Sequence, residues 1–234
     1  MSTPAGSSAA GASLDWSLTT RPRATTLDAQ LIGAARTLSS ATLHEASGKR
    51  GALPAAIKPV DPPFRICGSA FTVHSPGGDN LWLHRALDLA GAGDVLVVDV
   101  SGVYEHGYWG EIMSSAAKQR GLGGLVLNGC VRDGALLRKI GFAVFARGLA
   151  IRGTGKDFGA RGFINFPLLI GEITVQPGDL IVGDADGVVA VPAGTAAEVI
   201  VAARRRDEEE AAILKRIATG ERTLDIYGWR RPAR

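Results

Sequence analysis

The period of the apolar residues changes along the first third of the chain. From Leu27 to Gly48, apolar side chains recur three and four positions apart, which predicts a helix in two pieces. Residues 68–74 instead alternate in the manner of a strand, and residues 80–90 return to the helical period before Gly91. These patterns predict helix, strand and helix in that order.

The middle of the chain alternates strands with helices. Residues 94–100, 125–127 and 144–146 predict buried strands, and residues 110–120 and 133–140 predict the helices between them. This order, with short links, indicates a parallel βαβ layer. Active groups in such layers gather beyond the carboxyl ends of the strands. We therefore expect the chemistry in three segments, at residues 99–109, 128–133 and 147–156.

The last third of the chain has a different pattern. Three short apolar runs, at residues 173–175, 179–182 and 187–191, are separated by turn signals and predict an antiparallel or barrel-like half of the same domain. Residues 193–218 predict a C-terminal helix with Gly220 as its cap. Because no repeat and no long linker interrupts the chain, we predict an α/β fold with one domain at residues 21–234, after a flexible tail at residues 1–20.

The composition narrows the class of protein. With 46% hydrophobic and 21% charged residues the chain can bury a core, and no apolar run approaches the ~18 residues of a membrane span, so no membrane partner is expected. Acids and bases are interleaved and the formal net charge is only +3, which argues against nucleic acid as a partner. Cys67 and Cys130 lie far apart, which argues against a zinc knuckle or a disulfide framework and favours a cytoplasmic location.

Common catalytic motifs are missing. Lys156 follows a glycine but precedes an aspartate, so the chain has no P-loop, and residues 121–124 follow a predicted helix, which is the wrong order for a dinucleotide fingerprint. Neither GxSxG nor HExxH occurs. The glycine-rich residues 153–156 are interpreted as a basic surface loop rather than an anion site.

The segment from Asn128 to Asp133, with the sequence NGCVRD, holds the clearest candidate chemistry. It follows a predicted buried strand and places a guanidinium beside a carboxylate. Arg132 is suited to hold a carboxylate or keto oxygen by two hydrogen bonds, and Asp133 is suited to bind a hard cation. The alternative is that Asp133 only caps the next helix and Arg132 forms an external ion pair. The sequence alone leaves both interpretations open.

The start of the helix at residues 110–120 is a second candidate. The backbone amides of Gly110, Glu111, Ile112 and Met113 lack partners inside the helix and can receive a substrate carboxylate. Glu111 either only suits the helix dipole or faces the same pocket as Asp133 and holds metal-bound waters. In the C-terminal helix, residues 204–210 pair bases with acids four positions apart, which is typical of a solvated face worth ~0.3–0.5 kcal/mol per pair.

A series of motifs, collinear from about Ala41 to Arg230, carries a family resemblance: ATLHEASG, GSAFTV, GDNLWLH, GDVLVVD, YWGEIM, GGLVLNGCVRD, GFAVFARG, QPGDLIVGDADGVVAVP and LDIYGWR. In these motifs the sequence resembles the class II pyruvate aldolases of the RraA-like group, and within it the 4-hydroxy-4-methyl-2-oxoglutarate / 4-carboxy-4-hydroxy-2-oxoadipate aldolases. The resemblance implies a swivelling β/β/α fold with a central sheet flanked by helices and a C-terminal helix. It also implies homotrimers or homohexamers with active sites between subunits.

The resemblance further implies a divalent metal, Mg or Mn, and cleavage of a branched 2-keto acid to pyruvate, with decarboxylation of oxaloacetate as a side activity. Arg132 would then bind the pyruvyl oxygen, Asp133 would ligate the metal, and the amides of residues 110–113 would hold the pyruvyl carboxylate. Glu111 would hold metal waters, as would Glu210 of a neighbouring subunit, with Glu209 and Glu208 as near alternatives. A cation and a guanidinium at one keto oxygen stabilise the negative charge that both reactions develop.

Two positions depart from the family pattern: Asn128 stands where an acidic residue is usual, and Glu111 where aspartate is frequent. The roles of four polar residues stay open, namely His44, Glu45, Asn80 and His84. The alternative function is that of a non-enzymatic regulator, like the RraA protein that inhibits the RNA-degrading endonuclease RNase E. The acidic residues 208–210 and the tail at residues 224–227 favour the enzyme, because they resemble the aldolases.

Overall fold

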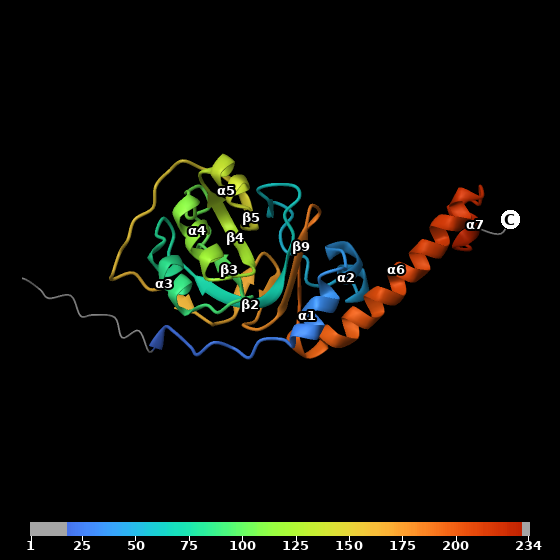
Figure 1. Ribbon diagram of the computed structural model, residues 1–234, viewed down its shortest axis with the longest axis horizontal. Coiled ribbons are helices and arrows are strands. Elements are labelled where there is room, and N and C mark those ends of the chain that lie inside the picture. Colours follow the sequence, from blue (N-terminus) through green and yellow to red (C-terminus); the bar gives the residue numbers. More distant parts are fainter. Residues whose placement is uncertain (1–17, 231–234) are drawn as a thin grey trace, which may run out of the picture.

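A mixed β-sheet runs through the protein, and a long C-terminal helix extends away from it (Figure 1). The computed structural model describes residues 18–230. The main sheet has the strand order β1-β5-β4-β3-β2-β9-β10, with β6 paired to β2, and β7 and β8 form a separate pair. The strands are β1 Lys58–Pro59, β2 Ile66–His74, β3 Val95–Asp99, β4 Gly124–Val131, β5 Val144–Leu149, β6 Phe163–Ile164, β7 Leu168–Ile170, β8 Ile173–Val175, β9 Leu180–Asp184 and β10 Gly187–Val191.

The parallel half of the sheet confirms the predicted βαβ layer. Strands β2, β3, β4 and β5 run parallel. The three helices that alternate with them cover one face, where their apolar side chains share a core with the strands. These helices are α3 Leu81–Leu89, α4 Glu111–Gln119 and α5 Gly134–Ile140. All carboxyl ends of the parallel strands therefore lie at one edge of the sheet, as the sequence predicts for the site.

The other half of the sheet is antiparallel, also as predicted. Residues 70–74 of β2 pair with β3, whereas residues 66–69 of the same strand pair with β9, so β2 belongs to both halves. Side chains of β7 to β10 pack against the uncovered face of the parallel strands in a second core. The sheet is thereby covered by helices on one face and by β-structure on the other.

A third core joins the N-terminal helices to the C-terminal helix. Helices α1 (Ala29–Ala35) and α2 (Ser40–Ala46) pack with α6 (Ala196–Ala218), which follows a single 3₁₀ turn at Ala193–Thr195. In α6 the buried residues are Ala196, Ile200 and Ala203. Beyond Asp207, whose carboxylate accepts a hydrogen bond from Thr42 on α2, the helix leaves the body and carries the short helix α7 (Thr223–Ile226) at its end (Figure 1).

Some details differ from the expectations drawn from the sequence. Strand β4 continues past Leu127 to Val131, so part of the predicted loop at residues 128–133 is strand. Most of the expected tail, residues 1–17, lies outside the described residues; at its end, Thr20 forms a β-bridge with Ile164. Within residues 18–230, none of the helices has the length and apolar character that crossing a bilayer requires.

Candidate active site

A β-bulge places the Arg132–Asp133 pair at the edge of the sheet. The register between β4 and β5 shifts between Leu127 and Cys130, after which β4 runs on to Val131. The two residues follow on the bend before α5, where Asp133 has a left-handed backbone with φ of 62°. Non-glycine residues adopt this conformation rarely, and more often at functional sites than elsewhere.

The carboxylate of Asp133 points away from the helix that it precedes. Asp133 occupies the N-cap position of α5, but its side chain makes no capping hydrogen bond there. Its Oδ2 atom instead accepts a hydrogen bond from the backbone N–H of Glu111 on α4, at 3.1 Å. The interpretation of Asp133 as a simple helix cap is therefore not what the structure shows.

Arg132 is held by its backbone and leaves its guanidinium open. The N–H of Arg132 donates to the carbonyl of Trp109 at 2.9 Å. Its Nε atom lies 3.8 Å from Oδ2 of Asp133, which is its one ion pair among the described residues. Half of the side chain is exposed, so the remaining N–H groups can bind a ligand.

The first turn of α4 opens beside this pair. Gly110 is the N-cap, and the amide of Glu111 is already used by Asp133. This corrects, for Glu111, the expectation that the whole run from residue 110 to 113 presents amides. The N–H groups of Gly110, Ile112 and Met113 have no acceptor in the described chain. The two adjacent amides of Ile112 and Met113, inside the first turn, suit one carboxylate group.

One pocket of about 480 Å³ contains all the residues predicted within a single chain. Its lining joins the α4 start and the Arg132–Asp133 pair to residues that the sequence left open or unassigned. The lining residues are Asn80, His84, Gly107, Tyr108, Trp109, Gly110, Glu111, Ile112, Met113, Arg132, Asp133, Gly153, Thr154 and Lys156. Asn80 and His84 thus belong to the pocket.

Lys156 lies on an exposed loop, as the sequence predicts, and it also lines the pocket. Its loop is tied to residues 78–80 through backbone hydrogen bonds, including one from the N–H of Gly155 to the carbonyl of Gly78 at 2.7 Å. The Lys156 ammonium donates to Oδ1 of Asn80 at 3.0 Å and reaches the pocket wall. Burial, and then the positive charge of Lys156, lowers the pKa of His84, which favours the neutral imidazole.

Other candidates lie outside the pocket. His44 and Glu45 are on α2, where the His44 ring contacts the carbonyl of Arg50 and Glu45 pairs with Lys49. On α6, Glu210 pairs with Arg206 at 2.8 Å. Neither Glu210 nor its neighbours Glu208 and Glu209 line the pocket of their own chain. Any contribution from them has to come from another subunit.

Asn128 lies outside the lining of the pocket. It is 3% exposed, and its amide bridges Asp99 and Arg147. The departure from the family pattern at this position therefore lies in a contact between strands.

The pocket fits a hydrated divalent cation. Asp133 and Glu111 are its two carboxylates, and residues 18–230 contain no group of three or more His, Cys, Asp or Glu side chains that could enclose a metal. Mg²⁺ keeps several of its waters and takes one or two carboxylates from the protein. In the described chain Oδ1 of Asp133 has no hydrogen-bond partner, so it is free to act as a ligand.

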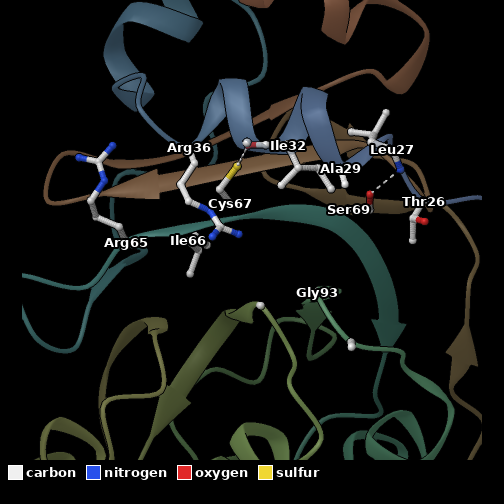
Figure 2. A pocket seen from close by; sticks show the side chains of 13 residues that line it. Thr26, Leu27, Ala29, Ile32, Arg36, Arg65, Ile66, Cys67, Ser69 and Gly93 are labelled. Carbon is white, nitrogen blue, oxygen red and sulfur yellow. Dashed lines mark hydrogen bonds between the residues drawn. The ribbon is translucent and has the colours of Figure 1, made fainter.

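A larger cleft, of about 760 Å³, lies at the opposite edge of the sheet under α1 (Figure 2). It is lined at the amino ends of the parallel strands, at Ile66, Gly93 and Gly123. Arg36 extends from the end of α1 past Cys67, whose thiol donates to the carbonyl of Ile32 at 3.4 Å. This cleft contains no carboxylate and lies far from the Arg132–Asp133 pair, so it is not the predicted site.

Comparisons with known proteins identify the family of the chain. A protein of Halalkalibacterium halodurans with the provisional name 4-hydroxy-4-methyl-2-oxoglutarate aldolase is 35% identical over 165 residues, which are 70% of this chain and 78% of that protein. The crystal structure of an uncharacterized protein from Pseudomonas syringae pv. tomato matches with a TM-score of 0.75 and 32% identity, covering 85% of this chain and 92% of the other.

A second solved structure is similar in fold. It is RraAS2 of Streptomyces coelicolor, described as an unusual member of the RNase ES inhibitor RraA protein family, with a TM-score of 0.71 and 26% identity over 80% of this chain and 97% of the other. A family model described as RraA-like, Aldolase/RraA, matches residues 24–190. Because that model covers most of the chain, the protein belongs to the RraA-like aldolase/RraA family.

Proposed function

We propose that the protein is a divalent-metal-dependent lyase that cleaves a 2-keto acid and releases pyruvate. The observation that carries the proposal is the convergence of Arg132, Asp133 and the open amides of Ile112 and Met113 in one pocket. The name of the Halalkalibacterium halodurans relative supports the same class of reaction. The proposed substrates are 4-hydroxy-4-methyl-2-oxoglutarate or 4-carboxy-4-hydroxy-2-oxoadipate, which give a second 2-keto acid, with oxaloacetate decarboxylation as a side activity.

Different residues of the pocket bind different groups at the pyruvyl end of the substrate. The amides of Ile112 and Met113 bind the carboxylate, and the guanidinium of Arg132 donates hydrogen bonds to the keto oxygen. Cleavage of the neighbouring C–C bond leaves negative charge on that oxygen, and the hydrogen bonds from Arg132 stabilise this charge. Asp133 would hold Mg²⁺ or Mn²⁺ directly and Glu111 through water. Such a cation supplies a further positive charge at the developing enolate.

Lys156 and His84, which also line the pocket, suit the far end of the substrate. Lys156 provides a positive charge there, and its hydrogen bond to Asn80 fixes its direction. Burial lowers the pKa of His84, which favours the neutral ring, and a neutral imidazole can donate or accept a hydrogen bond. A substrate with a second carboxylate is therefore held by two cationic side chains of the pocket lining, Arg132 and Lys156.

We propose that the working form is a homotrimer or homohexamer. Glu210 belongs to α6, whose outer end extends away from the body (Figure 1), and among the described residues it is not part of the lining of its own pocket. The proposal assigns it, with Glu208 and Glu209 as near alternatives, to the metal waters of a neighbouring subunit.

The proposal is tested by measuring pyruvate release from oxaloacetate and from 4-hydroxy-4-methyl-2-oxoglutarate, first with Mg²⁺ and then after EDTA. We expect release with Mg²⁺, loss of release with EDTA, and recovery when Mg²⁺ or Mn²⁺ is added in excess. Absence of release from both substrates would contradict the proposal and favour the regulator alternative, which an inhibition assay on an RNA-degrading endonuclease then examines.

Two substitutions test the site itself. Arg132→Ala and Asp133→Ala should each abolish turnover and leave the fold intact, because both side chains are partly exposed. Arg138→Ala is the matched control, since Arg138 lies on α5 outside the pocket and contacts only the carbonyl of Val60. Retained turnover in either pocket variant, with circular dichroism like that of the wild type, would remove the residue from the site.

A further inference from the structure

The side-chain amide of Asn128 ties three neighbouring strands together. Its Nδ2 atom donates to Oδ1 of Asp99 on β3 at 2.7 Å, and its Oδ1 atom accepts from Nε of Arg147 on β5 at 2.8 Å. Asp99 and Asn128 are direct partners in the register of β3 and β4. Because a carboxylate only accepts and a guanidinium only donates, these partners fix the orientation of the amide.

This contact lies directly before the β-bulge that leads to the pocket. The register of β4 shifts between Leu127 and Cys130, so Asn128 is the last side chain on the regular strand that holds polar partners across the sheet. It shares its face of the sheet with Val126, which packs in the core against β7 to β10. The side chain of Asn128 therefore lies on the face of the sheet that packs against β7 to β10, and it does not line the pocket.

Arg147 connects Asn128 to a second segment, residues 104–109. Its guanidinium lies 3.9 Å from the centre of the Tyr104 ring, while its Nε atom bonds Asn128. The carbonyl of Tyr104 in turn accepts from the N–H of Cys130 at 2.9 Å. One arginine thus holds both the strand before the bulge and the segment that pairs with the strand after it.

The same segment fixes the backbone of the proposed catalytic pair. The N–H of Tyr108 donates to the carbonyl of Cys130 at 3.1 Å, and the N–H of Arg132 donates to the carbonyl of Trp109 at 2.9 Å. Gly110 follows at once as the N-cap of α4. The position of Arg132 relative to the open amides of α4 therefore depends on how residues 104–109 sit against β4.

We propose that Asp99, Asn128 and Arg147 form a positioning clamp that sets where Arg132 and Asp133 lie relative to the start of α4. These three are positioning residues, and none of them contacts substrate. The inference rests on the proposed function for its catalytic consequence, but its structural part concerns the backbone alone. The amide of Asn128 donates on one side and accepts on the other, and Asp99 accepts both from this amide and from the N–H of Ser101. The clamp therefore needs one carboxylate and one amide at positions 99 and 128, in complementary roles.

Each single exchange breaks the clamp. Asn128→Asp loses the donor to Asp99 and sets two carboxylates side by side. Asp99→Asn sets two amides side by side and allows two arrangements: either the new N–H groups face the N–H of Ser101, or both amides turn over and the N–H groups of Asn128 face Arg147. Misplacement of reacting groups by about 1 Å costs on the order of 10²-fold in rate. We expect each single variant to lose at least roughly 10-fold in kcat at saturating Mg²⁺ and substrate, with a smaller change in KM.

The double variant Asp99→Asn with Asn128→Asp restores every contact with the roles exchanged. The new amide oxygen at position 99 then accepts from the N–H of Ser101, as Oδ2 of Asp99 does now at 3.0 Å, and the new amide nitrogen donates to position 128. The new carboxylate at position 128 accepts from Arg147. We expect the double variant to recover kcat to within roughly 3-fold of the wild type, because the geometry behind Arg132 returns. A double variant no better than the singles would overturn the clamp.

A backbone readout separates this inference from the proposed function. Hydrogen–deuterium exchange of residues 129–133 should speed up in both single variants and return to the wild-type rate in the double variant, with Asp61→Asn as a control for a lost carboxylate elsewhere. Unchanged exchange in the singles would overturn the clamp, whatever the activity. Suppose that the wild type releases no pyruvate, but that exchange is faster in both single variants and returns to the wild-type rate in the double variant. The clamp then stands and the proposed reaction fails.

Discussion

The carboxylate of Asp133 fills the space that a side chain at Gly110 would need. A Cβ atom built on Gly110 would lie 2.3 Å from Oδ2 of Asp133, well inside contact distance. The φ of Gly110 is −156°, an extended value that any residue adopts, so backbone strain does not require glycine there. The glycine is required because the loop before α4 and the Arg132–Asp133 bend approach each other this closely.

Gly110→Ala should therefore move Asp133 without unfolding the protein. We expect kcat/KM for pyruvate release to fall by roughly 10- to 100-fold, since misplacement of reacting groups has costs of this order. The control is Gly33→Ala in α1, where a Cβ would meet nothing within 4 Å. Equal activity of the two alanine variants would show that Asp133 does not need its present position.

Lys156 should act on binding rather than on the chemical step. Lys156→Met removes a charge-assisted contact, a class worth about 1.5–3 kcal/mol, so KM for a substrate with two carboxylates should rise by roughly 10- to 100-fold while kcat changes little. Lys139→Met on α5 is the matched control, because it lies outside the pocket. A fall in kcat at constant KM would instead place Lys156 in the chemistry.

Subunit mixing tests whether Glu210 serves a neighbouring site. Arg132→Ala and Glu210→Ala should each be nearly inactive alone, but subunits exchanged between them should regain part of the wild-type rate. The reason is that some mixed sites combine an intact Arg132 with an intact Glu210. Full activity of Glu210→Ala alone would mean that residues 208–210 only form ion pairs on the exposed face of α6, as Glu210 does with Arg206.

The buried thiol of Cys67 should make the fold less stable in alkali. Burial raises its pKa to about 11, against the opposing charges of Arg36 and Arg65 (Figure 2). The unfolded thiol ionises near pH 9, so between about pH 9 and 11 the unfolded state binds fewer protons than the native state. The free energy of unfolding should then fall by up to ~1.4 kcal/mol per pH unit.

This slope is measured by urea unfolding at a series of pH values. Cys67→Ala should lack that part of the slope, because it removes the titrating group and leaves the two arginines. The difference between the two proteins isolates Cys67 from the tyrosines and lysines that titrate in the same range. Parallel curves for both proteins would mean that Cys67 ionises as freely in the folded state as in the unfolded state.

The elements of the fold that depend on the local spacing of apolar residues were predictable from the sequence. The strands β3 and β5 and the helices α3 to α5 follow from apolar spacing, since each element packs one face against the same core. The short strands β6 and β7, with two and three residues, were not predicted because they are too short to show a period. Their strand geometry comes from pairing with other strands. β6 pairs with Val73 and His74 of β2, and β7 pairs with β8.

The part of the site that is formed by residues adjacent in the sequence was predictable. Arg132 and Asp133 are adjacent, and the carboxyl ends of parallel strands are the expected place for them. The contact between Lys156 and Asn80 joins residues 76 positions apart, and no local signal links them. The direction of the Asp133 side chain was likewise hidden, because an aspartate before a helix has the same sequence signature whether it caps that helix or binds another one.

The outer part of α6 has a consequence for how the protein responds to dilution. After Ala203 no residue of this helix is buried, and isolated helices of about 12–15 residues are marginal in water. Packing on another chain would supply the missing stability, and the order of this segment would then depend on protein concentration. If Glu210 completes a neighbouring site, the rate per subunit should decline when the protein is diluted below the dissociation constant of its subunits, long before the body of the chain unfolds.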